Sequence, residues 1–196
     1  MTQTLNKLKD QRLVHSGISW EQFKFIESGF ADSTAIRLFY YEGELEILAV
    51  SQDHEFFSRT ISALLFIFCL EKRIPFAPTG SFTQEREGVA SAQADESYFI
   101  GRNRTEQSPP DLSIEVVFTS GNESKLSRYK ALGVPEVWFW EDGLFSLYHL
   151  RKSGYKQIYR SEVLPELDID LLTRCLLMAD TVEAGLEFQR EIGRSQ

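Results

Sequence analysis

The chain has few of the residues that would assign it to a common functional class. Its two cysteines, Cys69 and Cys175, lie far apart in apolar stretches, and neither has a second Cys or a His at ligand spacing. We therefore expect buried, reduced thiols and no zinc site. The longest apolar run, residues 61–70, is shorter than the roughly 20 residues that a membrane-spanning helix needs. The polar start, residues 1–11, lacks the apolar segment of a signal peptide, so we expect a cytoplasmic protein.

Several catalytic motifs are also missing. The sequence has no Gly-rich phosphate loop, no Gly-x-Ser-x-Gly elbow and no His-Glu-x-x-His pair, and its three histidines (His15, His54 and His149) are scattered. Lys and Arg number 21 against 29 Asp and Glu, which gives a net charge of -8. This charge argues against a protein that coats nucleic acid by general electrostatics. It does not exclude an enzyme whose acidic site holds a metal ion that contacts phosphate.

The length and composition favour one globular domain. The 196 residues are 42% hydrophobic and 26% charged, and a chain of this length buries about 70% of its unfolded surface. We expect residues 1–18 to form a polar arm, either loose or as a short helix. Residues 19–196 would then form a single domain with a mostly helical tail from Leu164 to about Ile192.

Local patterns predict a mixed α/β fold. Ser19 and Gln22 form a capping box for a helix that ends at Gly29. A longer helix should run from an N-cap at Asp53 to about Lys72, and a short one from about residue 123 to 132. We expect strands at residues 36–41, 45–50, 76–84, 90–100, 111–118, 136–140, 144–150 and 155–160. Residues 111–140 should form a right-handed parallel β–α–β unit within a central mixed sheet flanked by helices, in the α/β or α+β class.

Acidic residues occur where strands are otherwise apolar. Glu115 lies within the apolar run 112–118, where a carboxylate must be paired or bind a metal ion. In the predicted strand 90–100, Asp95 and Glu96 stand between an alanine-rich stretch and a hydrophobic strand end. Two acids on neighbouring strands can hold Mg²⁺. Lys125 and Tyr129 are four residues apart on the following helix and share one face. A lysine beside a metal ion can orient water or offset charge on phosphate.

The succession of Asp95, Glu115 and a nearby lysine along the chain resembles the pattern of the PD-(D/E)xK nuclease superfamily. More closely, the chain resembles the Uma-type family of bacterial restriction-endonuclease-like proteins from about residue 20 to 160. The matching pieces are Gly43-Glu44-Leu45, His54, Gln93-Ala94-Asp95, Pro110-Asp111-Leu112-Ser113-Ile114-Glu115-Val116, Lys125-x-x-x-Tyr129 and Gly133-Val134-Pro135-Glu136-Val137-Trp138. The resemblance implies a restriction-endonuclease-like core and a nuclease site that uses Mg²⁺ or Mn²⁺.

By position, the resemblance implies that Asp95 and Glu115 bind the metal, with the Val116 carbonyl as a further ligand, and that Lys125 is the catalytic lysine. Ala94 replaces the proline that usually precedes the first acid. Val117 occupies the position, two after Glu115, where the superfamily usually keeps its lysine. DNA is the expected substrate, hydrolysed at its phosphodiester bonds, and a homodimer is expected.

Other residues have both a functional and a structural interpretation. Glu44 either completes the site or is a solvated hairpin charge, and His54 either approaches phosphate or packs at a helix start. Gln93 shares a strand face with Asp95 and could position water, and Tyr129 either bonds a site carboxylate or fills the core. Asp111 is expected to be structural. Arg102 and Arg104 either contact a phosphate backbone or belong to a solvated loop.

A non-catalytic binding or assembly module with the same fold is the alternative function. The negative charge supports it, as does a late hairpin rich in aromatic residues (Trp138, Phe139, Trp140 and Phe145) that could form a dimer seam. A glycosidase with a carboxylate pair is a weaker third hypothesis, because nothing suggests a sugar-binding cleft.

Overall fold

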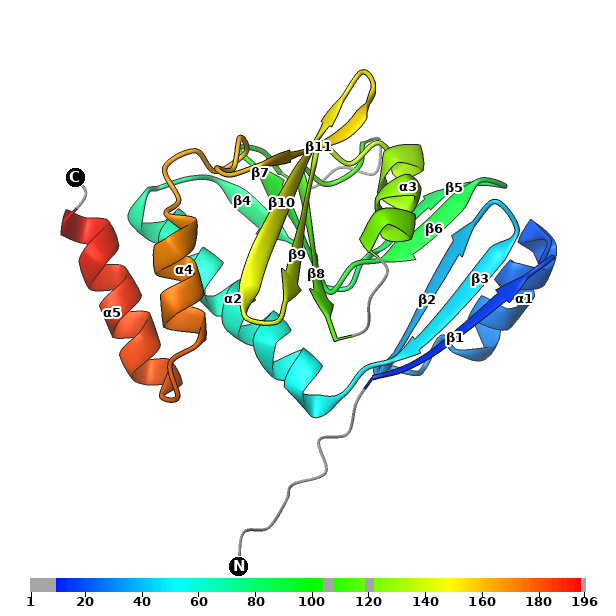
Figure 1. Cartoon of the computed structure of the whole chain (residues 1–196), viewed down its shortest axis with the longest axis horizontal. Helices are drawn as coiled ribbons and strands as arrows, with labels where there is room; N and C mark the ends of the chain where they lie inside the picture. The colour runs from blue at the N-terminus through cyan, green and yellow to red at the C-terminus, as the bar shows by residue number, and fades with distance from the viewer. Residues whose placement is uncertain (1–9, 104–107, 119–121, 195–196) are drawn as a thin grey trace, which may run out of the picture.

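The computed structural model describes residues 10–103, 108–118 and 122–194, and these form a mixed α/β fold (Figure 1). In chain order the elements are β1 (Gln11–Ser16), α1 (Trp20–Gly29), β2 (Ile36–Tyr41), β3 (Glu44–Ala49), α2 (Gln52–Glu71), β4 (Phe76–Pro78), β5 (Thr83–Arg86), β6 (Ala90–Gln93), β7 (Glu96–Ile100), β8 (Leu112–Val117), α3 (Asn122–Leu132), β9 (Glu136–Glu141), β10 (Leu144–Arg151), β11 (Gly154–Ile158), α4 (Ile169–Leu176) and α5 (Thr181–Arg194). The predicted class is confirmed. The strands form two sheets, however, and not the single central sheet that we expected.

The larger sheet contains the predicted β–α–β unit. Its six strands have the order β11-β10-β9-β8-β7-β4. Strands β8 and β9 are parallel, from Leu112 opposite Glu136 to Val117 opposite Glu141, and α3 connects them. The other pairs in this sheet are antiparallel. All six residues of β8 are buried, which places its polar members Ser113 and Glu115 inside the protein.

The smaller sheet contains a strand that we did not predict. Its order is β1-β3-β2-β6-β5, and all of its pairs are antiparallel. The expectation of a loose arm or short helix is wrong for residues 11–16, which pair with β3 from Gln11 opposite Ala49 to Ser16 opposite Glu44. All six side chains of β1 are exposed. No buried face therefore marks this segment as a strand in the sequence, and its backbone pairing with β3 defines it.

Two predicted strands are each divided between the sheets. Residues 90–100 form β6 in the smaller sheet and β7 in the larger one, with a break at Ala94 and Asp95. Residues 76–84 likewise contain β4 and the start of β5, separated by a turn in which Gly80 has a φ of 57°. The prediction of two continuous strands is wrong because the chain crosses from one sheet to the other at both places.

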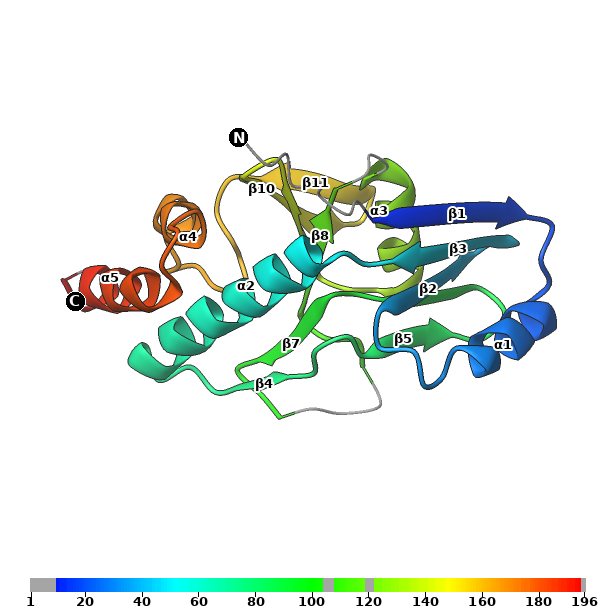
Figure 2. The same ribbon diagram turned by 90° about the horizontal axis from the view of Figure 1, so that it is seen from below.

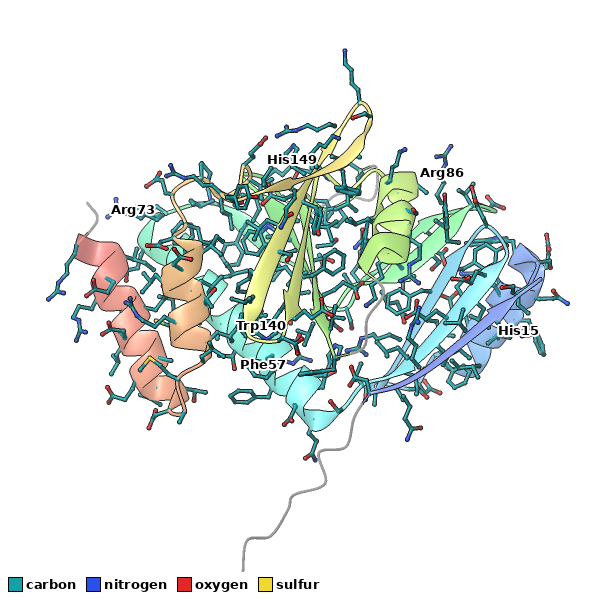
Figure 3. All side chains as sticks on the ribbon, in the orientation of Figure 1. His15, Phe57, Arg73, Arg86, Trp140 and His149 are labelled. Carbon is teal, nitrogen blue, oxygen red and sulfur yellow. The ribbon has the colours of Figure 1, made fainter. Side chains whose placement is uncertain are left out.

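Helices cover the larger sheet on one side. Helices α2, α4 and α5 lie together there (Figures 1 and 2), and Phe57 of α2 packs on Trp140 of β9 with 5.6 Å between ring centroids (Figure 3). The capping box at Ser19 is confirmed. The N-cap of α2 is Ser51 and not Asp53, because the Ser51 side chain accepts the His54 amide. The predicted helical tail consists of the two helices α4 and α5.

Helix α3 lies where the two sheets meet, and it contacts β5, β6 and β2 on one side and β9 and β11 on the other. An apolar cluster fills this junction, and it includes Phe39, Ala94, Val117 and Tyr129. Asp95, in the connection between the sheets, therefore lies beside α3 and the end of β8.

We expected four aromatic residues of the late hairpin to be available for a dimer seam, and this is wrong for three of them. Trp138, Phe139 and Trp140 are at most 2% exposed and pack within this chain, while Phe145 is half-buried against the apolar cluster that contains Trp138 and Trp140. Cys69 and Cys175 are confirmed as buried free thiols, and burial raises the pKa of Cys69 to about 11. Among the described residues, no helix is both long enough and apolar enough to span a membrane.

Candidate active site

Asp95 and Glu115 come together at the junction of the two sheets. The Asp95 amide donates to the Ile114 carbonyl at 3.1 Å, and the Val116 amide donates to Asp95 Oδ2 at 2.8 Å. The Asp95 carboxylate therefore lies against the peptide group that joins Glu115 to Val116. Both acids are buried, at 5% and 1% exposure. The break between β6 and β7 thus allows the Asp95 side chain to accept a backbone amide of β8.

Helix α3 supplies two donors to Glu115. Lys125 Nζ lies 2.7 Å from Glu115 Oε2, and the Tyr129 hydroxyl donates to Glu115 Oε1. Lys125 and Tyr129 are one helical turn apart, so the predicted shared face exists and points at the carboxylate. Burial raises the pKa of Tyr129 well above its usual value, and the neighbouring Glu115 carboxylate raises it further. Tyr129 is therefore a neutral donor at physiological pH.

His54 and Arg37 lie at the other oxygen of Asp95. His54 Nε2 is 2.8 Å from Asp95 Oδ1 and Arg37 Nε is 3.8 Å from it. On its far side, His54 Nδ1 hydrogen-bonds to Asp10 Oδ2 at 2.8 Å. Burial disfavours the imidazolium, but the carboxylates of Asp10 and Asp95 outweigh burial and raise the pKa of His54 to about 9. His54 is therefore a cation between two anions at neutral pH.

Glu46 of β3 is a buried acid that the sequence analysis missed. Its oxygens accept from Arg128 of α3 and from Arg12 of β1, each at 2.8 Å. Burial would raise the pKa of Glu46, but Arg128, Arg12 and Lys125 outweigh it and lower the pKa to about 2. Glu46 stands in the run Leu45-Glu46-Ile47-Leu48. An acid within an apolar strand is the same signal that identified Glu115.

The aromatic ring of Phe39 supports two cations of α3. The Arg128 guanidinium carbon lies 4.3 Å from the Phe39 centroid, and Lys125 Nζ lies 5.8 Å from it. Cations over a ring face are attracted by its quadrupole. Phe39 therefore helps to hold both cations beside the acids.

Two of the predicted accessory residues do not join the carboxylates. Glu44 is exposed at the start of β3 and lines a pocket of about 360 Å³ between the hairpin and Ser127 and Arg128 of α3. Gln93 Oε1 accepts the Leu38 backbone amide and Gln93 Nε2 donates to the Thr83 hydroxyl, each at 2.9 Å. Gln93 therefore ties β6 to β2 and β5, and Glu44 has the position of a hairpin charge.

The structural role of Asp111 is confirmed. Arg102 donates to both of its carboxylate oxygens, at 2.9 and 3.0 Å, and the Ile100 amide donates to one of them. Arg102 is therefore engaged within the chain, with 35% of its side chain exposed. The other predicted basic residue, Arg104, lies outside the described residues.

The donor set suits a hard divalent cation. Mg²⁺ usually takes one or two carboxylates and keeps several waters, and Asp95 and Glu115 are two buried carboxylates on adjoining backbone segments. A carboxylate oxygen has two lone pairs, so one protein contact at an oxygen leaves room for a metal ion. Within the described part of the chain, no group of three or more His, Cys, Asp or Glu side chains is arranged around one metal position. The Val116 carbonyl remains a predicted ligand.

Charges of the two signs are balanced in this network, which is buried except for the partly exposed side chains of Arg12 and Glu55. Its cations are Arg12, Arg37, His54, Lys125 and Arg128, and its anions are Asp10, Glu46, Glu55, Asp95 and Glu115. A bound divalent cation would make the network net positive. A phosphate group would then be attracted in spite of the chain's overall charge of -8.

The mixed α/β fold thus places two buried acids beside a lysine, as the resemblance to restriction-endonuclease-like proteins implies. The family described as "Uma2: Putative restriction endonuclease" matches residues 20–179, and the chain belongs to this family. The crystal structure of "a putative nuclease belonging to DUF820" from Anabaena variabilis ATCC 29413 is similar to this fold. It has a TM-score of 0.52 and 16% sequence identity, over 87% of this chain and 99% of that chain. No curated protein matches the sequence.

Proposed function

We propose that the protein is a Mg²⁺- or Mn²⁺-dependent endonuclease that hydrolyses phosphodiester bonds in DNA. The observation that carries the proposal is the buried pairing of Glu115 with Lys125 directly beside Asp95. Burying a lysine and two carboxylates costs several kcal/mol in lost hydration even when they are paired. A metal-dependent nuclease site uses buried charges of this kind. Membership in the restriction-endonuclease family supports the same reaction.

Asp95 and Glu115 would hold the metal ion. When bound, such an ion polarises a phosphate oxygen and lowers the pKa of a coordinated water. Lys125 donates from Nζ and can orient the attacking water or offset the charge that develops on phosphate. Tyr129 holds Glu115 in place, as the Val116 amide and His54 hold Asp95. The surrounding apolar cluster excludes bulk water, which strengthens each of these interactions.

The test is calorimetric titration with Mg²⁺ and with Mn²⁺, combined with cleavage of supercoiled plasmid at low salt. Asp95→Asn and Glu115→Gln should lose metal binding and cleavage, and Lys125→Met should bind metal but not cleave. Glu87→Gln, at an exposed turn, is the matched control and should behave as the wild type. If the wild type binds neither metal, the carboxylates are structural. Metal binding without cleavage of DNA would assign a different substrate.

The non-catalytic module remains the second candidate, and one observation favours it. Both oxygens of Asp95 and both of Glu115 have a protein partner. A purely structural ion-pair network would show the same pairing. The metal titration separates the two functions, because a structural network has no requirement for a divalent cation.

A further inference from the structure

Two charged residues of this network precede the part of the chain that matches the family. The match covers residues 20–179, whereas Asp10 and Arg12 belong to the segment at and just before β1. We propose that Asp10 is a positioning residue of the nuclease site, which holds His54 against Asp95 and thereby fixes the direction of the Asp95 carboxylate. The inference rests on the proposed function, since it concerns the same metal-binding acid.

Asp10 makes two contacts that converge at the start of α2. Its Oδ1 accepts the Ser51 amide at 2.8 Å, and its Oδ2 bonds to His54 Nδ1 at 2.8 Å. Ser51 is the N-cap of α2, and its side chain accepts the His54 amide. Asp10 is 7% exposed and His54 is fully buried. The ring of His54 is thus held from the side that faces away from the candidate metal-binding acids.

The other nitrogen of His54 faces Asp95. His54 Nε2 lies 2.8 Å from Asp95 Oδ1, while Asp95 Oδ2 accepts the Val116 amide. The carboxylate is therefore held at both oxygens, once by the backbone of β8 and once by a ring whose orientation depends on Asp10. Groups that fix a metal-binding side chain typically change metal affinity by about 10- to 100-fold when they are removed.

Arg12, in the same segment as Asp10, contacts the other half of the charge network. It donates to Glu46 at 2.8 Å, and Glu46 accepts Arg128 of α3 on its second oxygen. Arg12 can contact Glu46 because β1 pairs with β3, where Arg12 lies opposite Leu48, two residues along the strand from Glu46. Two residues of one short segment therefore contact both halves of the charge network.

These contacts are distinct from core packing. Every residue of β1 is exposed, so the strand adds little apolar burial to either sheet. Asp10 instead contacts a histidine ring and a helix cap. Replacing Asp10 should therefore change the geometry at Asp95 more than it changes the hydrophobic core.

The experiment compares Asp10→Ala and Asp10→Asn with His15→Ala in the full chain, by calorimetric titration with Mn²⁺. His15 is an exposed residue of the strand that follows Asp10, β1 (Figure 3), and is the matched control. We expect the Mn²⁺ dissociation constant to rise about tenfold or more in Asp10→Ala. A smaller rise is expected in Asp10→Asn, which keeps an acceptor oxygen, and none in His15→Ala. Asp10→Ala binding Mn²⁺ as the wild type does would overturn the proposal.

A second measurement separates this inference from the proposed function. Proton NMR of the wild type should show a slowly exchanging Nδ1–H of His54, because that proton is buried and bonded to Asp10. The signal should disappear in Asp10→Ala and persist in His15→Ala. If the wild type binds no Mn²⁺, the nuclease proposal is wrong, and an unchanged His54 signal in Asp10→Ala would show that Asp10 does not position the ring.

Discussion

Lys125 Nζ and Glu115 Oε2 form an ion pair 2.7 Å long, in which both side chains are at most 5% exposed. The pair joins α3 to β8, two elements that are consecutive in the β–α–β unit. Both charges are buried, so the pair should contribute to the free energy of unfolding. Unfolding measurements test this contribution, and metal binding and cleavage test the pair's proposed catalytic role. This pair, the nearby residues Tyr129 and Glu46, and the more distant buried carboxylate of Glu136 can each be tested by substitution.

Lys125→Met should lower the free energy of unfolding by about 3–5 kcal/mol, because it leaves Glu115 as a buried charge without its cation. Adding Glu115→Gln should recover part of this loss, since the double variant buries neither charge. Urea unfolding of the two single variants and the double variant measures the coupling. If the double variant is as unstable as the sum of the single changes, the two residues do not act as a pair.

Tyr129→Phe should cost about 1–3 kcal/mol of unfolding free energy, because Glu115 loses a donor to a charged oxygen. Tyr155→Phe is the matched control. Its hydroxyl donates to the neutral Val134 carbonyl at 2.5 Å, and its loss should cost about 1 kcal/mol. Chemical unfolding of both variants at pH 7 checks the order. Equal losses would show that the charge on Glu115 adds nothing to the Tyr129 bond.

Glu46 should make stability depend on pH in the acid range. Its pKa in the folded protein is about 2, whereas its ordinary value is 4.5. A lowered pKa stabilises the folded state above the ordinary value, and the contribution is lost as the pH falls from about 4.5 to about 2. The free-energy difference between the wild type and Glu46→Gln should therefore be several kcal/mol at pH 7 and shrink over this range.

Urea unfolding of the wild type and Glu46→Gln at a series of pH values measures this effect. Glu44→Gln is the control, because Glu44 is exposed two residues away on the same strand. Its difference from the wild type should be small throughout. A constant difference for Glu46→Gln between pH 2 and pH 5 would contradict the assignment.

Glu136→Gln should loosen the segment after β11. The buried carboxylate accepts the Trp138 indole at 2.7 Å, the Ser161 hydroxyl at 2.6 Å and the Glu162 amide at 2.9 Å. A glutamine has one acceptor oxygen in place of two, so some of these donors lose their partner at about 1–3 kcal/mol each. Hydrogen exchange at the Glu162 amide should accelerate. Unchanged exchange there, with Glu166→Gln as the exposed control, would contradict this role.

Much of the fold was predictable because local chemistry sets the element boundaries. Ser19 and Gln22 define the start of α1, and the turn at Glu42 and Gly43 separates β2 from β3. In the turn, Gly43 has a φ of 85°, a conformation that glycine adopts without steric cost. The parallel unit between β8 and β9 was predicted correctly, because an apolar strand, a helix and a second apolar strand follow one another.

The division of the strands into two sheets was not predictable in the same way. Residues 90–100 have strand character throughout, and only the interaction of Asp95 with the Val116 amide shows why the chain leaves one sheet there. Strand β1 has no buried side chain, so its sequence carries no alternating pattern. In both places the partner that stabilises the conformation is far away in the sequence.

The acids of the candidate site were detectable, and most of their partners were not. Asp95 and Glu115 stand out because a carboxylate is unusual beside apolar strand residues. Glu46 carries the same signal and could have been found by it. Arg37, within the apolar run Ile36-Arg37-Leu38-Phe39, carries a similar signal. Asp10 and Arg12 have no such signal, because a charged residue in a polar stretch is ordinary on a protein surface.

The sequence by itself determined the helices, most strands, the mixed α/β class and the pairing of an acidic strand with a lysine-bearing helix. These depend on capping residues, turns and apolar periodicity, which act over a few residues. Only the tertiary structure decided that Asp95 crosses between two sheets and that His54 and Asp10 stand behind it. Only it decided that Arg12 and Arg128 share Glu46. A buried charge is stable only with partners at hydrogen-bonding distance, and the fold brings those partners from distant segments of the chain.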